Sequence, residues 1–342
     1  MFLKKLQNDG QKEEGGQYMI TIIVSIYNAE EYLTKCLNDL RYQTYHKLEI
    51  ILVNNGSIDS SGEICERFSK ADTRFKVIHK KNDGLSAAFN AGLLIAKGKY
   101  VSFVNAFDRV ESIMFEHLLS LIIKTNGDMV VCDYIEEDST ISSEQAKTYN
   151  MKEWSKTKAI QKEINRETEQ GFMHNKLFKM DLFKRPEALR FNPNIFIYED
   201  LLLYIECVLK SEKIFYTPAP YYHTFKSRYP IRVELSRLEQ ETGLRTLLFI
   251  IDLCISFKEL DIAKLKGRYA TLNIELLMRA YDQSLKEKRE VEKFKKNLYR
   301  FKLTELENMK LRIRCLVARR NSKLSYFIWK LQNKEKYSLV GI

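Results

Sequence analysis

Short apolar runs alternate with segments of helical periodicity from Met19 to about Tyr134. The run M-I-T-I-I-V-S at 19–25 is nearly continuous and rich in β-branched residues, which predicts a strand buried on both faces. Between such runs, apolar residues recur every three or four positions, as at Leu33 and Leu37, and this spacing predicts amphipathic helices. The expected strands cover residues 19–25, 48–53, 75–79, 100–104 and 129–132.

This alternation predicts an α/β fold in which right-handed crossovers build a mostly parallel sheet flanked by helices. Asn28 and Glu31 have the spacing of a capping box and predict the start of the first helix. Ligands of such sheets bind beyond the carboxyl ends of the strands. We therefore expect the functional residues in the loops that follow the strands, at 26–28, 54–59, 82–85 and 105–109.

The second half of the chain predicts a different organisation. A polar stretch at 139–169 predicts a surface loop, and 199–210 predicts a helix followed by a short strand at 214–216 and a turn at P-A-P. From about residue 233, helical periodicity continues almost to the end of the sequence. We expect a flexible tail at 1–18, an α/β domain at 19–230 and a helical region at 231–342.

The net charge indicates which partners the protein binds, and the distribution of cysteines indicates its cellular compartment. The 56 lysines and arginines exceed the 45 acidic residues and give a net charge of +11, which suits a phosphate-bearing partner such as a nucleotide or an anionic membrane. No nucleic-acid-binding motif is recognisable, so we expect no nucleic acid partner. The six cysteines are scattered in apolar surroundings, which predicts buried reduced thiols. With no signal peptide and no membrane-spanning run visible, the expectation is a cytoplasmic protein.

A basic and aromatic segment lies near the carboxyl end, at 309–336. Its apolar residues, among them Phe327, Ile328 and Trp329, interleave with lysines and arginines such as Lys323. This mixture fits a helix in an anionic membrane interface, and it also fits a helix packed on the α/β domain. The first reading places the protein peripherally at the inner face of the membrane.

Seven sequence segments follow one another in the order typical of one enzyme family. They read IIVSIYNAEEYL, QTYHKLEIILVNNGSIDSS, NDGLSAAFNAGLLIAKGKY, FVNAFDRV, HNKLF, YEDLLL and YYH. Over residues 19–227 the chain resembles the family 2 glycosyltransferases with the GT-A fold. The resemblance implies a Rossmann-like GT-A domain and an inverting, nucleotide-sugar-dependent hexosyltransferase with a donor of the UDP type.

The resemblance also implies a donor site, in which several family residues are replaced. The positions it assigns to the donor are Ile26, Tyr27, Asn28, Asn54, Asn55, Gly56, Ser57, Gly84, Leu85, Ser86, Asn105 and Ala106. The family usually carries two acidic residues at Asn54 and Asn55; an amide oxygen still accepts a hydrogen bond but carries no charge. The family's arginine three residues after Ser86 is Phe89, and a phenyl ring does not replace a guanidinium at a diphosphate. Gly56 and Ser57 equally fit a plain strand-to-helix turn.

The family's metal motif, L-D-x-D-D, aligns with V-N-A-F-D at 104–108. Hard cations bind anionic oxygens, which Phe107 lacks, and the Asn105 amide is a weak ligand. Asp108 remains a weak metal candidate, as does His223, which lies where some relatives place a late ligand. We therefore expect little or no dependence on Mg²⁺ or Mn²⁺.

The acceptor side keeps more of the family pattern. Glu199 and Asp200 match its E-D pair, which implies that Asp200 is the general base for the acceptor hydroxyl. Asn175 and Lys176 match its N-K-L, where the lysine supports the site or a phosphate. Without the resemblance, these pairs equally fit a helix amino terminus and an ordinary surface pair.

Two functions remain open on this evidence. The first is transfer of a sugar from a nucleotide sugar to a lipid-linked or other glycan acceptor in surface polysaccharide assembly. The second is a pseudoenzyme that keeps the GT-A fold and supports a partner glycosyltransferase. The five replacements on the donor side favour the pseudoenzyme, while Asp200, Asn175 and Lys176 favour the transferase.

Overall fold

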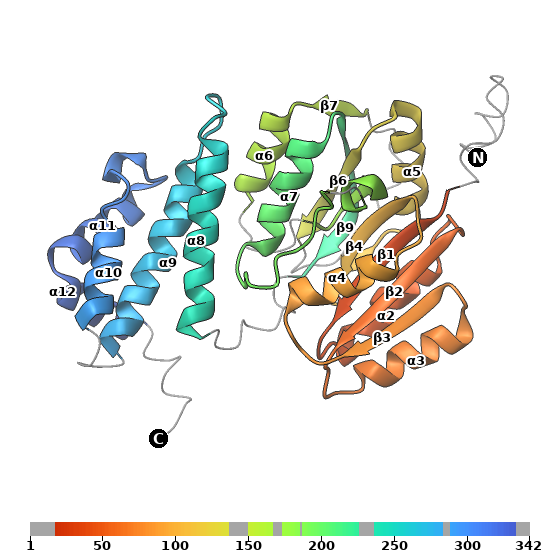
Figure 1. Cartoon of the computed structure of the whole chain (residues 1–342), viewed down its shortest axis with the longest axis horizontal. Coiled ribbons are helices and arrows are strands. Elements are labelled where there is room, and N and C mark those ends of the chain that lie inside the picture. Colours follow the sequence, from red (N-terminus) through yellow and green to blue (C-terminus); the bar gives the residue numbers. More distant parts are fainter. Residues whose placement is uncertain are drawn as a thin grey trace. The chain divides into compact units, whose positions relative to one another are not determined.

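The computed structural model describes residues 18–136, 150–166, 173–184, 187–225, 236–282 and 288–332. The chain forms two compact units (Figure 1). The first contains the chain up to Glu163 and from Thr168 to Val233, and the second contains Ile164–Glu167 and Glu234–Ile342. The second unit is therefore built from two separate segments of the chain, the first of which has four residues. Residues 1–17, which make up most of the predicted tail, lie outside the described residues.

A mixed sheet forms the centre of the first unit, with the strand order β3-β2-β1-β4-β8-β6-β9-β5 and with β7 beside β9. The strands are β1 Ile20–Ile26, β2 Leu48–Asn55, β3 Phe75–Lys80, β4 Tyr100–Asn105, β5 Arg109–Val110, β6 Met129–Glu136, β7 Lys152–Trp154, β8 Lys176–Lys179 and β9 Ile214–Thr224. Strands β1 to β4 pair in parallel, and β8 lies antiparallel between β4 and β6. Because β6 and β9 run parallel again, the predicted mostly parallel α/β sheet is confirmed.

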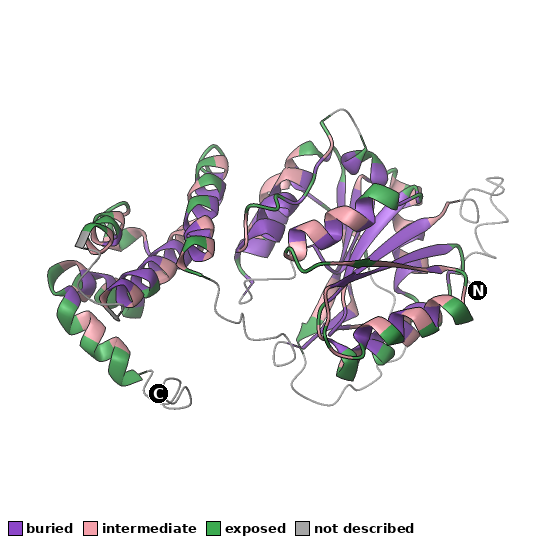
Figure 2. Cartoon of the chain, turned by 60° about the horizontal axis from the view of Figure 1, so that its bottom comes forward, coloured by how far each residue is buried: buried purple, intermediate pink, exposed green. Residues whose placement is uncertain are grey.

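Helices flank this sheet and follow the predicted order. They are α2 Glu30–Arg41, α3 Ser61–Ala71, α4 Leu85–Ile95, α5 Met114–Thr125, α6 Lys156–Ile164 and α7 Glu199–Lys210, with a 3₁₀ turn at Met180–Phe183. The strands are buried along most of their length, whereas the helices alternate between buried and exposed positions (Figure 2). The apolar runs of the sequence thus form the core, as their continuity predicts.

The amino ends of the parallel strands carry carboxylates with polar partners. Glu49, near the start of β2, accepts hydrogen bonds from the Thr21 hydroxyl at 2.6 Å and the Lys97 amide at 2.8 Å, and it pairs with Lys76. Burial acts to raise the pKa of Glu49, but these hydrogen bonds outweigh it and lower the pKa below its usual value.

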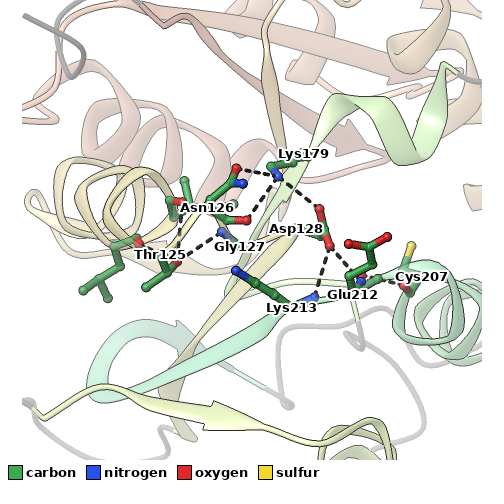
Figure 3. A network of polar contacts seen from close by, with 11 residues as sticks. Thr125, Asn126, Gly127, Asp128, Lys179, Cys207, Glu212 and Lys213 are labelled. Carbon is green, nitrogen blue, oxygen red and sulfur yellow. Dashed lines mark hydrogen bonds and ion pairs between the residues drawn. The ribbon is translucent and has the colours of Figure 1, made fainter.

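Asp128, just before β6, is the second such carboxylate (Figure 3). It accepts from the backbone N–H groups of Glu212 at 2.8 Å and Lys213 at 3.1 Å, and from the Lys179 ammonium at 3.1 Å. Burial acts to raise its pKa, and the hydrogen bonds from Lys213, Glu212 and Lys179 lower it overall. We refer to Glu49, Asp128 and their partners as the amino edge of the sheet.

The first helix begins differently from the prediction. The N-cap of α2 is Ala29, which has no side-chain cap, so the predicted capping box of Asn28 and Glu31 is wrong. Asn28 adopts a left-handed φ of +46° and accepts through Oδ1 from the Ile58 amide at 2.9 Å. The first residue of α3 supplies the missing cap, because the Ser61 hydroxyl accepts from the Ala29 amide at 2.9 Å. Long-range contacts thus replace the local capping box that the spacing predicts.

Two further predictions of irregular structure need correction. The polar stretch at 139–169 contains β7 and α6, and α6 buries Ala159 and Ile160 despite its polar composition; 137–149 and 167–169 lie outside the described residues. The P-A-P sequence does not form a turn but lies inside β9, where the pairing with β6 shifts register. A bulge accommodates prolines because they need no ladder hydrogen bond there.

The second unit is helical, as the periodicity after residue 233 predicts. Its helices are α8 Arg237–Cys254, α9 Ala263–Asp282, α10 Lys288–Asn297, α11 Met309–Arg320 and α12 Ser322–Gln332, with a 3₁₀ turn at Leu303–Glu305. Helix α8 starts with a capping box, in which the Ser236 hydroxyl accepts from the Glu239 amide. Within this unit, the Arg268 guanidinium donates to the Arg166 carbonyl at 2.6 Å. No helix among the described residues is long and apolar enough to span a bilayer.

Candidate functional site

The carboxyl ends of the parallel strands bring the predicted donor residues together. In the sheet register, Ile26 of β1 lies opposite Asn54 of β2, and Ser25 lies opposite Asn105 of β4. Strand β8 runs antiparallel, so its first residue also lies at this edge. We call this region the carboxyl edge of the sheet. Ile26 and Ala106 are fully buried, whereas Tyr27 is 38% exposed.

Asn54 is a buried amide that uses both ends of its side chain. Its Nδ2 lies 3.0 Å from His79 Nδ1, and its Oδ1 accepts from the Ser57 backbone amide at 3.2 Å. The other ring nitrogen of His79 lies 3.0 Å from a carboxylate oxygen of Glu66. A neutral His79 that accepts from Asn54 therefore donates to Glu66. An aspartate at position 54 has no N–H for this contact.

Asn55 makes the same kind of double contact. Its Nδ2 donates to Asn82 Oδ1 at 3.1 Å and to the Gly84 carbonyl at 3.3 Å. Its Oδ1 accepts from the Lys80 ammonium at 3.3 Å, and Lys80 also pairs with Asp83. Partial burial lowers the pKa of Lys80. The amide thus joins β2 to the loop before α4, which explains physically why an amide occupies this position.

The start of α4 shows why arginine is absent there. Gly84, the N-cap, has a φ of +92°, and a Cβ added to it would lie 3.8 Å from Phe196. Ser86 is 3% exposed, and its hydroxyl has no hydrogen-bond partner among the described residues. Phe89 is 1% exposed and stacks on Phe191 with a centroid distance of 5.0 Å. Position 89 therefore belongs to an aromatic core and does not face a diphosphate.

The loop that aligns with the metal motif is closed by its own contacts. Asn105 Oδ1 accepts from the Phe107 amide at 3.2 Å. Phe107 is 8% exposed and packs edge-on against Tyr32 with a centroid distance of 6.0 Å. A phenyl ring thus occupies an apolar site at the position where the family motif has a carboxylate.

Asp108 is fully buried and hydrogen-bonded through both oxygens. Its Oδ2 accepts from the Tyr222 hydroxyl at 2.7 Å, and its Oδ1 accepts from the Phe225 amide at 3.3 Å. The Tyr222 hydroxyl in turn accepts from the Asn105 amide at 3.2 Å. The ring of His174 stacks on Tyr222, and its Nδ1 lies 3.8 Å from Asp108. This carboxylate therefore links the loop after β4 to β9.

These residues do not fit a Mg²⁺ or Mn²⁺ site. A hard cation needs several anionic or carbonyl oxygens turned toward one point. Asp108 uses both oxygens in the fold, and His223, the second weak candidate, pairs through Nε2 with Glu111 at 2.8 Å. Within the part of the chain that the structure describes, no three His, Cys, Asp or Glu residues converge as metal ligands.

Asn175 and Lys176 lie at the carboxyl edge but point into the fold. Asn175 has a φ of +56° and donates through Nδ2 to the Cys132 carbonyl. Lys176 is fully buried, forms an ion pair with Glu163 at 3.0 Å and lies over the Tyr204 ring. The reading of these residues as an ordinary surface pair is therefore wrong. The Lys176 ammonium is held inside the fold by Glu163 and the Asn175 side chain, and is not exposed to a ligand phosphate.

Glu199 and Asp200 open α7, and both are buried, at 7% and 4% exposure. Tyr198, just before them, has a φ of +65°. Only three residues separate the end of α7 from the start of β9 at the amino edge, so the first turn of α7 lies toward the carboxyl edge. The approach of Phe196 to Gly84 also brings the segment that leads into α7 next to the donor loops.

Sequence reasoning missed three residues that shape this edge: Lys80, His174 and Tyr222. Lys80 ends β3 beside Asn55, and the alternating strand and loop pattern offers a signal for it, since strand ends supply site residues. Tyr222 lies more than a hundred residues from Asp108 in the sequence, and no local pattern indicates that contact.

All six cysteines are free and buried, as predicted, and burial raises the pKa of Cys132 to about 12.

Comparison with known proteins identifies this arrangement. The sequence pattern of glycosyl transferase family 2 matches residues 21–185. The chain is 32% identical to EpsH of Bacillus subtilis strain 168 over 229 residues, which is 65% of this chain and 62% of EpsH. It is 35% identical to the glycosyltransferase GlyA of Streptococcus pneumoniae serotype 4 over 240 residues, 67% of this chain but 33% of GlyA. The chain thus spans less than two thirds of either relative.

A solved structure supports the fold. The Staphylococcus aureus TarS 1–349 complex with UDP-GlcNAc has a TM-score of 0.60 to this chain and is 19% identical to it. The match covers 90% of this chain and 89% of the TarS chain. At this identity the likeness concerns the fold alone, which is GT-A. The family match and the curated relatives show that residues 21–185 of this chain form a domain of glycosyl transferase family 2.

Proposed function

We propose that this chain transfers a sugar from a UDP-type nucleotide sugar to a glycan or lipid-linked acceptor without a divalent cation. The observation that carries the proposal is the convergence, at one sheet edge, of the loops after β1, β2 and β4 with the start of α7. The TarS neighbour with UDP-GlcNAc supports a UDP donor. Surface polysaccharide or glycan assembly at the inner face of a membrane is the role we propose for this activity.

The donor loops suit a nucleotide in their chemistry. Asn54 and Asn55 have amide oxygens that accept hydrogen bonds from a base or a ribose, at the expense of their contacts with Ser57 and Lys80. Gly56 has a φ of +75°, and a Cβ there would lie 2.6 Å from the Asn82 nitrogen. Glycine is therefore required here, where two backbone segments approach each other closely in the loops proposed to hold the donor.

Asp200 is the proposed general base. In inverting transfer, a carboxylate takes the proton of the acceptor hydroxyl while that oxygen attacks the anomeric carbon. The bond between the anomeric carbon and the diphosphate oxygen breaks on the opposite face, and the nucleoside diphosphate leaves with the electron pair. The position of Asp200 in the first turn of α7 suits this role, because the helix start fixes its backbone.

The charge that builds up on the leaving diphosphate needs a partner other than a metal ion. Lys80 ends β3 and is held at the edge by Asn55 and Asp83. The amino end of α4 lies next to it, with the buried Ser86 hydroxyl in its first turn. A cation and a helix amino terminus both favour negative charge, and together they support metal-independent departure of the diphosphate.

Calorimetry on the full chain tests the donor and the metal together. We expect UDP and a UDP-sugar to bind with nearly the same Kd in EDTA and in Mn²⁺, because no metal ion contributes to the proposed site. The Kd should change by less than about threefold, which corresponds to under about 0.7 kcal/mol of binding free energy. Binding that disappears with EDTA and returns with Mn²⁺ would show that the metal assignment is wrong. If no UDP-sugar or GDP-sugar binds under either condition, the proposed donor site fails.

Turnover separates a transferase from a pseudoenzyme. Membership of a glycosyltransferase family supports turnover, and the donor-side replacements are the observation that favours a pseudoenzyme. We expect UDP release from a UDP-sugar to accelerate when a membrane glycolipid extract is added, with Asp200→Asn as the inactive control. Donor binding without any stimulated release would instead support the pseudoenzyme.

A further inference from the structure

The outer faces of the last two helices carry apolar residues that the fold leaves in solvent. On α11, Leu311, Cys315 and Ala318 are buried, whereas Met309 and Ile313 on the other face are 64% and 55% exposed. One face thus packs within the unit and the opposite face remains uncovered. Spacings of three and four residues place each set on one side of the helix.

Helix α12 repeats this arrangement more regularly. Its exposed apolar residues are Leu324, Phe327, Ile328 and Leu331, with exposures of 47%, 60%, 41% and 49%. The positions i, i+3, i+4 and i+7 form a continuous stripe along the helix. The other side of α12 faces the unit, because the Tyr326 ring stacks on Tyr281 of α9. We call these residues, together with Met309, Ile313 and Leu316 of α11, the outer stripe.

Only positive charges accompany the outer stripe. Residues 309–332 contain seven lysines and arginines and no aspartate or glutamate. Arg312 and Arg319 bind backbone carbonyls of the preceding segment and stabilise the fold. Lys310, Arg314 and Lys323 are exposed. In an anionic membrane surface, an apolar stripe contacts the acyl chains and basic residues beside it contact the phosphate headgroups. The outer stripe and its basic neighbours have this composition.

From this charge complementarity, we infer that α11 and α12 dock the protein on an anionic lipid surface. Phe327, Leu331 and their neighbours insert at the level of the acyl chains, while the lysines and arginines contact lipid phosphates. A second protein copy is a poorer partner for this surface, because two faces of the same positive charge repel each other. The inference does not depend on the proposed sugar transfer.

Vesicle sedimentation with the full chain tests this surface. We expect binding to vesicles of phosphatidylcholine with about one third phosphatidylglycerol, little binding to pure phosphatidylcholine, and weaker binding at 0.5 M salt because the charges are screened. Equal binding to both vesicle types, or binding to neither, overturns the inference.

Two variants separate the apolar and the basic contributions. Phe327→Ser with Leu331→Ser should lower the partition coefficient about 30-fold or more, because it removes two inserted side chains. Lys310→Gln with Arg314→Gln should lower it about 30-fold at low salt and have little effect at high salt, since each cation contributes about fivefold.

The matched control is Phe249→Ser on α8, because Phe249 is also exposed, at 50%, and lies in the same unit outside the outer stripe. It should bind vesicles like the unmodified protein. Undiminished binding by the Phe327→Ser, Leu331→Ser variant would remove the stripe from the interaction. Concentration-dependent self-association that this variant abolishes, without vesicle binding, would assign the face to a second copy and overturn the membrane inference.

Discussion

The two edges of the sheet differ in whether carboxylates or amides make their polar contacts. At the amino edge, Glu49 and Asp128 remain acidic and are neutralised by lysines and backbone N–H groups. At the carboxyl edge, Asn54 and Asn55 stand where the family usually has acids, and each uses the N–H that an acid lacks. The comparison shows that carboxylates at the amino edge are held by purely structural contacts, whereas at positions 54 and 55 of the carboxyl edge the contacts need the N–H of an amide.

The largest expected effect lies at the carboxyl edge. Asp200→Asn should lower kcat by about 10²–10⁴-fold while the Kd for the UDP-sugar changes little, because the amide keeps the shape and loses the basicity. Steady-state kinetics and calorimetry on the same preparation measure the two quantities. Glu206→Gln, on the same helix and away from its start, is the control and should retain activity. Full activity in Asp200→Asn would exclude Asp200 as the base.

The second effect should fall on stability alone. Asp128→Ala removes a carboxylate that accepts two backbone N–H groups and an ammonium, and we expect a loss of about 2–3 kcal/mol in the free energy of unfolding. Urea unfolding measures it. Glu212→Ala is the matched control, because it keeps the backbone N–H and removes only an exposed side chain. A change in donor affinity without loss of stability would contradict the structural role of the amino edge.

A third, smaller effect tests why amides occupy the carboxyl edge. Asn55→Asp places an oxygen against Asn82 Oδ1 and the Gly84 carbonyl, and gains attraction to Lys80. The net result should be a loss of about 1 kcal/mol, since lost donors outweigh a partly exposed ion pair. Thermal unfolding measures this, and Asn55→Ala separates the charge from the lost contacts. A more stable Asn55→Asp protein would show that the amide is not required by the fold.

The smallest effect is a difference in acid sensitivity. In the folded chain the pKa of Asp128 is lowered, because its hydrogen bonds outweigh burial, so its stabilisation is complete above the unfolded pKa of about 3.9 and is lost as the pH falls through the folded value. Amides at the carboxyl edge do not titrate. Stability measured between pH 6 and pH 3 should therefore fall less steeply in Asp128→Ala than in the unmodified protein. Parallel curves would mean that this carboxylate has no lowered pKa.

The sequence predicts the strands and most helices well, because continuous apolar runs and helical spacing are local signals. It places Asn54, Asn55 and Asn105 at one edge through topology alone. It does not predict that Phe89 joins Phe191 in an aromatic core or that Tyr222 binds Asp108, because those contacts join distant parts of the chain. Conformations such as the left-handed Tyr198 also follow from tertiary packing and leave no local pattern.

The local signals also mislead where a polar sequence folds regularly. Helix α6 is predicted as a loop, because lysines and other polar residues dominate its composition. Its buried side contains Ala159 and Ile160, and the buried Glu163 forms an ion pair with Lys176. A buried charge pair of this kind is invisible to hydropathy, since each partner alone reads as a surface residue.

Because the short segment Ile164–Glu167 belongs to the second unit, this protein cannot be divided by a single cut in the chain. A cut after the last strand leaves the Arg166 carbonyl without the Arg268 guanidinium, and the isolated helical part lacks the same partner. Recombination that exchanges the helical part between relatives must therefore carry this short internal stretch with it, or find a substitute. The exchangeable module is therefore the helical unit together with Ile164–Glu167, although the two pieces are separated in the sequence.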